Sequence, residues 1–457
     1  MTVGKDKKIA VIGAGLCGLT AAYRLQNAGF SVQVLEKSAG PGGRVQLVEK
    51  NGYLFDIGAD AITNGYTEYI QLADELGIKD LIVPTNVEVA TIRNGRLITF
   101  DASLISMAMT PLLSWSAKFR LLKASFALRK ETGKLEIPKM YEMAHLDDPT
   151  MSAGALSKKI FGKEAADYLI DPMIKLWNGT NADHCSTLDV YLSMAAASHQ
   201  PMAMKGGQAI FPRTIAKHLT VNYNTTVNTV IPQDDGGIKI DYQTPNGDQQ
   251  QTIVDGCVIA TMHDSAERIY PEVKNICSNV GNGIVKMALI KMQLAYRAPT
   301  QTAAYLVQVP DVEDPELYCL FLEHNKCPDR VPEGCSIVTV YTTNEATHQY
   351  LDNTDEELTE WARARVEKYM PELSGHFEFS LVSRWPYMAQ ASYPGYYRKA
   401  ATDFPKVIDS GNIQLACDVF TKGGQNTAVV WGNQAARNLA QVLSERNDRS
   451  RSAMQNI

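Results

Sequence analysis

Residues 9–36 carry an apolar strand, a glycine-rich turn, a helix and a second strand in succession, and this order constrains the fold more than any other feature. The first strand, expected at 9–12, is short and wholly apolar, as buried strands are. A second apolar run, 32–35, ends on Glu36. Three glycines at the GxGxxG spacing join the first strand to the helix: Gly13, Gly15 and Gly18. The sequence therefore predicts the opening βαβ unit of a Rossmann-like α/β domain.

Each glycine of this turn has its own steric task. Gly13 permits the tight turn, Gly15 lets the backbone approach a pyrophosphate, and Gly18 lets the helix pack close to the sheet. The helix N-terminus presents unpaired N–H groups and the positive end of its dipole to the phosphates. Glu36 can accept hydrogen bonds from ribose hydroxyls, and its carboxylate disfavours a 2′-phosphate. The pattern predicts a dinucleotide site that does not take NADP.

A second glycine turn, formed by Gly42, Gly43 and Arg44, follows the second strand directly. Next to the first turn, it would bring another backbone segment to the same pyrophosphate. Arg44 would add a positive charge and a fork of hydrogen-bond donors. The alternative is an ordinary surface turn that carries a solvated arginine.

Three N-terminal blocks resemble a known superfamily: GAGLCGL, VLEKSAGPGGRV and GYLFDIGAD. They are similar to those of the flavin-containing amine oxidase, protoporphyrinogen oxidase and carotenoid (phytoene) desaturase superfamily. Weaker similarity continues in the same order at 110–122, 158–190, 205–219, 257–262 and 412–443. The resemblance implies FAD as the cofactor. It implies the following cofactor-binding residues: Gly13, Gly15, Gly18, Glu36, Lys37, Gly42, Gly43, Arg44, Gly58, Ala59, Val227, Asp418 and Val429.

Two details of the resemblance concern cysteines. ASYPGYY, residues 391–397, corresponds to the segment where covalent members carry a flavin-linking cysteine, and it contains none. We therefore expect the FAD to be held non-covalently. In ACDVF, Cys417 occupies a position where the superfamily usually has glycine, so its role is open.

The expected architecture is an α/β fold with a discontinuous Rossmann-like FAD-binding domain of the GR2 type and a second, α+β substrate-binding domain. The FAD-binding domain is expected to comprise 1–90, 205–285 and 405–445. The substrate-binding domain is expected to comprise 91–204 and 286–404, followed by a polar tail, 446–457. Within it, the helical stretch 101–130 is expected to form a lid over the pocket. Because basic residues are interspersed among its apolar ones, peripheral membrane contact is the alternative.

Composition excludes several classes of function. The net charge of −6 over 457 residues, without a basic cluster, argues against nucleic-acid binding. The N-terminus has no apolar segment of the kind found in secretory signals. The eight cysteines form no CxxC pair, which favours reduced thiols, a cytoplasmic location and no metal site.

Two residues are expected to be catalytic by resemblance, Lys286 and Tyr396. Lys286 lies in GNGIVKMALI, which resembles the strand on which amine oxidases carry a lysine that holds water near flavin N5. The alternative is a strand lysine that points to solvent. Tyr396 lies in ASYPGYYRKA, which resembles the segment with an aromatic residue beside the substrate amine. The pocket is expected to include Trp177, Tyr393, Tyr397 and Trp431.

The expected reaction is a two-electron dehydrogenation, with hydride transfer to flavin N5, of a small or medium-sized apolar substrate. A C–N bond would be oxidised in an amine oxidase, and a C–C bond in a protoporphyrinogen oxidase or desaturase. Gly423, Gly424 and Gln425 occupy the place of a second aromatic wall, which weakens the amine alternative. The acceptor would be O2 or a quinone, and the chain a monomer or homodimer. A different alternative is a redox-neutral isomerase, or an FAD-binding protein without turnover.

Overall fold

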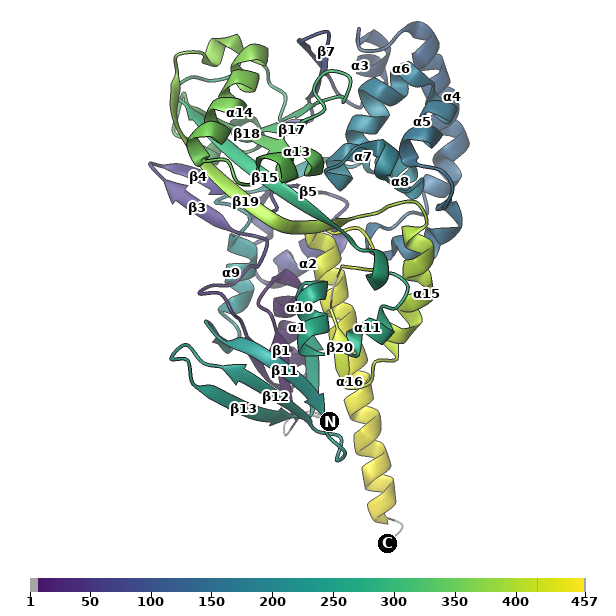
Figure 1. Cartoon of the computed structure of the whole chain (residues 1–457), viewed down its shortest axis with the longest axis vertical. Helices are drawn as coiled ribbons and strands as arrows, with labels where there is room; N and C mark the ends of the chain where they lie inside the picture. Colours follow the sequence, from purple (N-terminus) through teal and green to yellow (C-terminus); the bar gives the residue numbers. More distant parts are fainter. Residues whose placement is uncertain (1–6, 417, 456–457) are drawn as a thin grey trace.

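The computed structural model describes residues 7–416 and 418–455, with side chains as far as residue 445. A five-stranded parallel sheet forms the lower half of the molecule in Figure 1. In spatial order its strands are β10 (Val221–Asn222), β2 (Ser31–Leu35), β1 (Lys8–Ile12), β14 (Gly256–Ile259) and β20 (Ile413–Leu415). Because these strands come from three separate stretches of the chain, this half is assembled discontinuously. The predicted α/β class and βαβ opening are confirmed.

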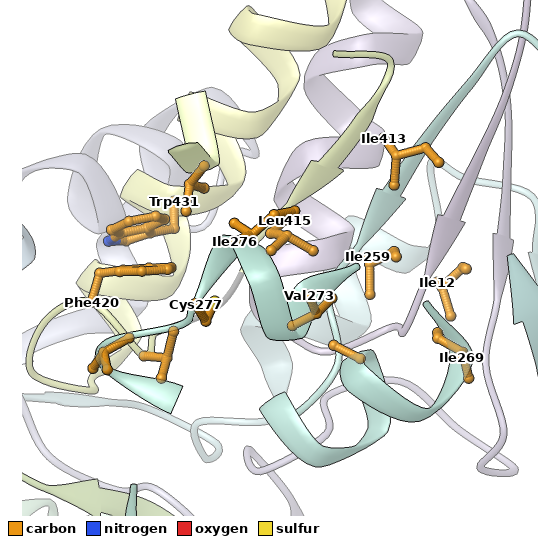
Figure 2. Packing of buried hydrophobic residues seen from close by; sticks show 14 of the residues in the cluster. Ile12, Ile259, Ile269, Val273, Ile276, Cys277, Ile413, Leu415, Phe420 and Trp431 are labelled. Atoms are coloured by element: carbon orange, nitrogen blue, oxygen red, sulfur yellow. The ribbon is translucent and has the colours of Figure 1, made fainter. Parts of the chain in front are cut away.

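Two helices pack together against this sheet, α1 (Leu16–Asn27) and α16 (Gln425–Gln455). Gly432 of α16 permits their close approach, because an added Cβ would lie 2.5 Å from the Cys17 carbonyl oxygen. Buried aliphatic side chains from the sheet and both helices, among them Val11, Leu19 and Leu439, form one core. A second core lies on the other side of the sheet. Figure 2 shows that it joins the strand residues Ile12, Ile259 and Leu415 to the helical residues Ile269, Val273 and Trp431.

A three-stranded antiparallel sheet is inserted between β10 and β14. It contains β11 (Thr226–Pro232), β12 (Ile238–Gln243) and β13 (Gln249–Val254). Gly236-Gly237 and Asn246-Gly247 form the turns between these strands. Gly236 and Gly247 adopt φ angles of +85° and +89°, which other residues rarely adopt.

A seven-stranded sheet forms the core of the other half of the molecule. Its order is β19 (Phe377–Ala391), β15 (Val285–Tyr296), β18 (Ser336–Thr342), β17 (Leu317–Leu322), β16 (Leu306–Gln308), β7 (Val89–Arg93) and β8 (Arg96–Phe100). All pairs are antiparallel except β16 with β7. Helix α14 (Asp355–Tyr369) packs on this sheet and opens with a capping box formed by Thr354 and Glu357.

Helices cover the remaining side of this half, at the upper right of Figure 1. They are α3 (Leu104–Met109), α4 (Trp115–Thr132), α5 (Ala153–Phe161), α6 (Lys163–Ala165), α7 (Asp171–Asn178) and α8 (Leu188–Ala196). The remaining helices lie between or beside the sheets: α2 (Thr67–Glu75), α9 (Ile210–Ala216), α10 (His263–Ile269), α11 (Val273–Ile276), α12 (Glu323–Lys326), α13 (Asn344–Tyr350) and α15 (Tyr396–Ile408).

Two small sheets connect the halves. One pairs β3 (Leu47–Lys50) with β4 (Tyr53–Asp56), and the other has the order β5 (Ile62–Thr63), β9 (Pro201–Met204), β6 (Ile82–Pro84). Because β9 pairs with β5 and β6, residues 201–204 associate with the first segment of the chain. Strand β7 belongs to the seven-stranded sheet from Val89 onward, just before the expected boundary at residue 90.

Helix α16 extends through the segment expected to be a separate polar tail, as far as Gln455. In the part of the chain that the structure describes, no helix combines the length and the apolar character needed to cross a membrane.

Candidate functional site

One elongated cavity of about 680 Å³ lies between the parallel sheet and the seven-stranded sheet. Both halves of the molecule contribute lining residues, of which Ile12 is the first along the chain and Trp431 the last. This volume is within the range of sites that hold a small molecule or cofactor. The two glycine turns and Glu36 line one end, and aromatic side chains of the seven-stranded sheet line the other.

The two glycine turns lie side by side. The Gly42 N–H donates to the Ala14 carbonyl at 2.8 Å, and an added Cβ on Gly43 would lie 3.2 Å from Gly15 Cα. A Cβ on Gly15 itself would meet no protein atom within 4 Å. The backbone of Gly15 therefore faces open space at the start of α1, where the predicted pyrophosphate would be held. The residues present fit a dinucleotide.

The other two glycines of the fingerprint are required by packing. Gly13 has a φ of +103°, and an added Cβ would lie 2.6 Å from the Ala260 carbonyl oxygen. An added Cβ on Gly18 would lie 2.0 Å from the Gly13 carbonyl oxygen. These contacts match the tasks assigned to the two positions from the sequence.

The Glu36 carboxylate links the first glycine turn to the loop that follows β2. One of its oxygens accepts from the Ala14 N–H at 2.6 Å and the other from the Ser38 N–H at 2.8 Å. The side chain is almost fully buried and lines the cavity beside Lys37 and Val227. The negative charge of Glu36 would disfavour a 2′-phosphate on a ribose bound beside it.

Arg44 links the second glycine turn to the C-terminal part of the chain. Its guanidinium donates to Asp418 Oδ2 at 3.0 Å and to the Met388 carbonyl at 2.8 Å. Arg44 is therefore not the solvated turn arginine of the alternative interpretation, because it is paired with two residues that line the cavity.

The structure brings together most of the residues expected at the site. The lining includes Gly13, Gly15, Glu36, Lys37, Gly42, Gly43, Arg44, Gly58, Ala59, Trp177, Val227, Asp418 and Trp431. Of the described residues, six expected ones lie outside the lining: Gly18, Lys286, Tyr393, Tyr396, Tyr397 and Val429. Cys417 lies outside the described residues.

Lys286 lies on β15 with its side chain about half exposed. Its ammonium group pairs with the Asp264 carboxylate of α10 and lies 5.6 Å from the centre of the Tyr387 ring. The neighbouring Met287 and Ala288 line the cavity instead. The geometry thus corresponds to the alternative interpretation, a strand lysine that faces solvent.

The three tyrosines expected near the substrate pack the first turn of α15 into the protein. The Tyr396 hydroxyl donates to the Val419 carbonyl, and the Tyr397 hydroxyl donates to Asp189 Oδ1 at 3.3 Å. Both side chains are buried. Tyr393 accepts a hydrogen bond from Lys399 at 3.1 Å. Gly395, with a φ of +84°, caps the N-terminus of α15, and none of the three tyrosines is among the lining residues.

A buried lysine that sequence reasoning missed, Lys422, lines the cavity. Its ammonium group donates to Ser392 Oγ at 2.9 Å and to the Asn178 side chain, and lies 3.8 Å from Asp189 Oδ1. Burial raises the pKa of Asp189, and the Lys422 charge opposes that shift. No local pattern marks this cluster, because its members come from α7, α8 and two loops.

Beneath the cavity lies a second buried lysine, Lys291, whose Nζ is 2.6 Å from Asp60 Oδ2. It also donates to the carbonyls of Asp56 and Gly58. Burial alone would raise the pKa of Asp60, but the charges of Lys291 and Lys326 lower this pKa to about 2. Asp60 also lines the cavity, and its negative charge is balanced by the Lys291 ammonium group.

The helical stretch 101–130 does not form the expected lid. Among the described residues, none that lines the cavity comes from α3 or α4. The inner apolar residues of α4 pack on α5, α7 and α8 instead. Residues 176–179, at the end of α7, line the cavity on this side.

The family model described as flavin containing amine oxidoreductase matches residues 16–440. The chain belongs to this family. It is therefore a flavin-dependent oxidoreductase, and the predicted superfamily is confirmed.

Curated relatives include two kinds of porphyrinogen oxidase. The chain is 23% identical over 438 residues to coproporphyrinogen III oxidase of Staphylococcus aureus, covering 86% of this chain and 89% of that enzyme. It is 32% identical to protoporphyrinogen oxidase 2 of Arabidopsis thaliana, over 38% of this chain and 33% of the plant protein.

Solved structures of similar fold include amine oxidases. Putrescine oxidase bound to putrescine aligns with a TM-score of 0.75 at 19% identity, covering 95% of this chain and 99% of that one. Cyclohexylamine oxidase of Brevibacterium oxydans aligns with a TM-score of 0.75 at 17% identity, covering 97% and 100%. At these identities the likeness shows the fold alone.

Proposed function

We propose that this chain binds FAD non-covalently in the cavity and catalyses the two-electron dehydrogenation of a small or medium-sized apolar substrate. The observation that carries the proposal is the division of one cavity into two chemically different ends. One end presents glycine backbone and paired charges, and the other presents apolar and aromatic surface. Such a division suits a cofactor that must contact a water-poor substrate site.

Support for the cofactor comes from the residues at the first end. Gly15 and Gly43 leave backbone exposed to the cavity, and Glu36 is held in place by two backbone N–H groups. Arg44 and Asp418 are fixed to each other beside them. When bound there, the flavin would accept the two electrons removed from the substrate.

Support for an apolar substrate comes from the second end. Its lining side chains belong to one apolar cluster: Leu176, Leu289, Tyr305, Leu306, Tyr318, Phe321, Tyr341, Trp385 and Met388. Three of the aromatic polar groups are satisfied within the protein: Trp385 Nε1 donates to the Ile57 carbonyl at 2.8 Å, the Tyr318 hydroxyl donates to the Leu176 carbonyl, and the Tyr341 hydroxyl donates to the Asp60 carboxylate. These side chains would exclude water and orient a substrate by its apolar faces.

A neutral substrate suits this cavity better than a cationic amine. The carboxylates of the lining are engaged within the protein: Asp60 pairs with Lys291, Asp418 pairs with Arg44, and Glu36 accepts two backbone N–H groups. The positively charged Lys422 also lines the cavity. We therefore favour oxidation of a C–C bond, in an alicyclic, porphyrinogen-like or isoprenoid compound, over oxidation of an amine.

The proposal includes O2 or a quinone as the electron acceptor, a monomer or homodimer, and a cytoplasmic location. Within this scheme Lys422 is the cavity group best suited to hold a proton, because its ammonium is fixed by Ser392 and Asn178. Lys286 remains the alternative implied by the sequence resemblance.

The test is an absorbance spectrum of the purified protein, followed by anaerobic addition of amines, cyclic ketones and porphyrinogen-like compounds, and then air. We expect flavin bands that bleach with the C–C substrates. A prompt return in air identifies an oxidase, and bleaching without return identifies a dehydrogenase that uses a quinone. Bleaching by amines alone would overturn the substrate class. Conversion without net bleaching under any condition would support the redox-neutral isomerase.

A further inference from the structure

Helix α3 presents large apolar side chains to solvent at the outer surface of the helical layer. Leu104, Ile105 and Met109 are 80%, 79% and 75% exposed. The helix is tied to α4, because Lys118 Nζ donates to the Ala108 carbonyl at 2.7 Å. Contiguous exposed apolar surface of this kind marks a site of interaction.

The same surface continues along α4. Trp115, Phe119, Leu122 and Phe126 are 74%, 72%, 47% and 62% exposed. At 3.6 residues per turn, these four positions fall within an arc of about 60° around the helix axis. They therefore form one apolar stripe, 115–126, along the outer face of the helix. Figure 1 shows α4 at the outer edge of the molecule.

The opposite face of α4 is already occupied. Ala117 and Ala124 are buried, and Leu121 and Leu128 pack beside them on the core formed with α5, α7 and α8. The helix is thus apolar on two opposite faces, of which the fold uses one. The stripe does not face the cavity either, since none of the lining residues in the described chain comes from α3 or α4.

Basic residues flank the stripe on both sides. By the same helical spacing, Lys118 and Arg129 lie on one side and Lys123 and Lys130 on the other. Residues 101–134 carry six basic and two acidic side chains, whereas the whole chain has a net charge of −6. The positive charge is therefore concentrated around the exposed apolar surface.

We propose that α3 and α4 form a docking face for a membrane surface that contains anionic lipids, with the apolar stripe inserted at the headgroup boundary. An apolar stripe between rows of lysine and arginine, with tryptophan and phenylalanine on its apolar side, is the arrangement of interfacial helices. The flanking cations attract anionic headgroups. A second copy of this chain is a poorer occupant, because a symmetric contact would set these like charges against each other.

The experiment is co-sedimentation of the full chain with vesicles of phosphatidylcholine alone and of phosphatidylcholine mixed with phosphatidylglycerol. We expect binding to the mixed vesicles that weakens as salt is added. Phe119→Ser combined with Phe126→Ser should reduce binding roughly tenfold or more. Lys123→Glu combined with Lys130→Glu should reduce binding by a similar factor and abolish the salt dependence.

The matched control is Ile253→Ser combined with Val312→Ser. These side chains are 61% and 55% exposed and lie in β13 and in the loop between β16 and β17, not on α3 or α4, so their removal should leave vesicle binding unchanged. Thermal unfolding of each variant verifies the fold, which substitutions at such exposed positions should preserve. Equal loss of binding in the control pair would contradict the proposal.

A second measurement reports whether Trp115 is inserted into the bilayer. Intrinsic fluorescence in vesicles made with brominated lipids should be quenched, and the quenching should fall in the Trp115→Phe variant. Absence of sedimentation with both vesicle types would overturn the proposal. So would sedimentation equilibrium in which the chain self-associates through a contact that the Phe119→Ser and Phe126→Ser pair abolishes, since the occupant would then be a second copy.

Discussion

The ammonium group of Lys291, on the seven-stranded sheet, lies 2.6 Å from the carboxylate of Asp60, which follows β4 in the first segment of the chain. Both side chains are buried, and the same ammonium donates to the Gly58 carbonyl at 3.2 Å. One charge therefore joins the two halves of the molecule directly beneath the cavity.

Lys291→Met should destabilise the protein by about 3–5 kcal/mol, because it leaves the buried Asp60 carboxylate without its nearest cation. The measurement is urea unfolding of the variant and the wild type. Adding Asp60→Asn to Lys291→Met should recover part of the loss, since the uncompensated charge is then gone. Equal stability of the wild type and Lys291→Met would contradict this account.

Asp171, in the helical layer, gives a prediction for pH. Burial raises the pKa of Asp171 to about 7, against the hydrogen bond that it accepts from Ser157. The folded protein thus binds a proton that the unfolded chain releases near pH 4, so stability should fall as pH rises from about 4 to about 7. In Asp171→Asn this loss should be smaller by roughly 2 kcal/mol. Parallel pH profiles for the two proteins would contradict the assignment.

Gly15 and Gly18 should respond differently to a single methyl group. A Cβ on Gly15 meets no protein atom, so Gly15→Ala should unfold like the wild type and yet bind FAD roughly ten- to hundredfold more weakly. A Cβ on Gly18 would meet the Gly13 carbonyl, so Gly18→Ala should lose about 2 kcal/mol of stability. Apoprotein unfolding and flavin titration separate the two effects. Unchanged FAD affinity in Gly15→Ala would place the cofactor elsewhere.

Two lysines compete for a role in the reaction. Lys422→Met should slow anaerobic flavin reduction by roughly tenfold or more, with partial recovery in Lys422→Arg. Lys286→Met removes a half-exposed ion pair and should change the rate by less than about twofold. The reverse ranking would restore Lys286 as the flavin partner implied by the sequence resemblance.

The glycine-rich end of the candidate site was predictable because the residues that form it lie close together in sequence. Gly13, Gly15 and Glu36 lie within one βαβ unit, where local spacing dictates position. The apolar end was not predictable, because the residues that meet there are far apart in sequence. Lys422 is fixed by Asn178 and Ser392, and only the tertiary fold brings them together.

The tyrosines after Gly395 illustrate the same limit. Sequence resemblance aligned Tyr396 and Tyr397 with a substrate wall, but Val419 and Asp189 supply acceptors on the core side. The helix 115–132 posed a related problem. Its apolar residues occur on two faces, and the sequence does not indicate which one the fold covers.

The parallel sheet has a consequence for how the protein is made. Strand β20, near the C-terminal end, pairs with β14, and α16 packs on α1. During synthesis these elements follow β1 and β2, from which most of the described chain separates them. Since the cavity lining includes residues as far along the chain as Trp431, a flavin held there would have no complete binding site until that residue has been translated. Capture of a flavin in this cavity would therefore follow synthesis of the first turns of α16, and until β20 is made the nascent sheet lacks the edge strand that pairs with β14.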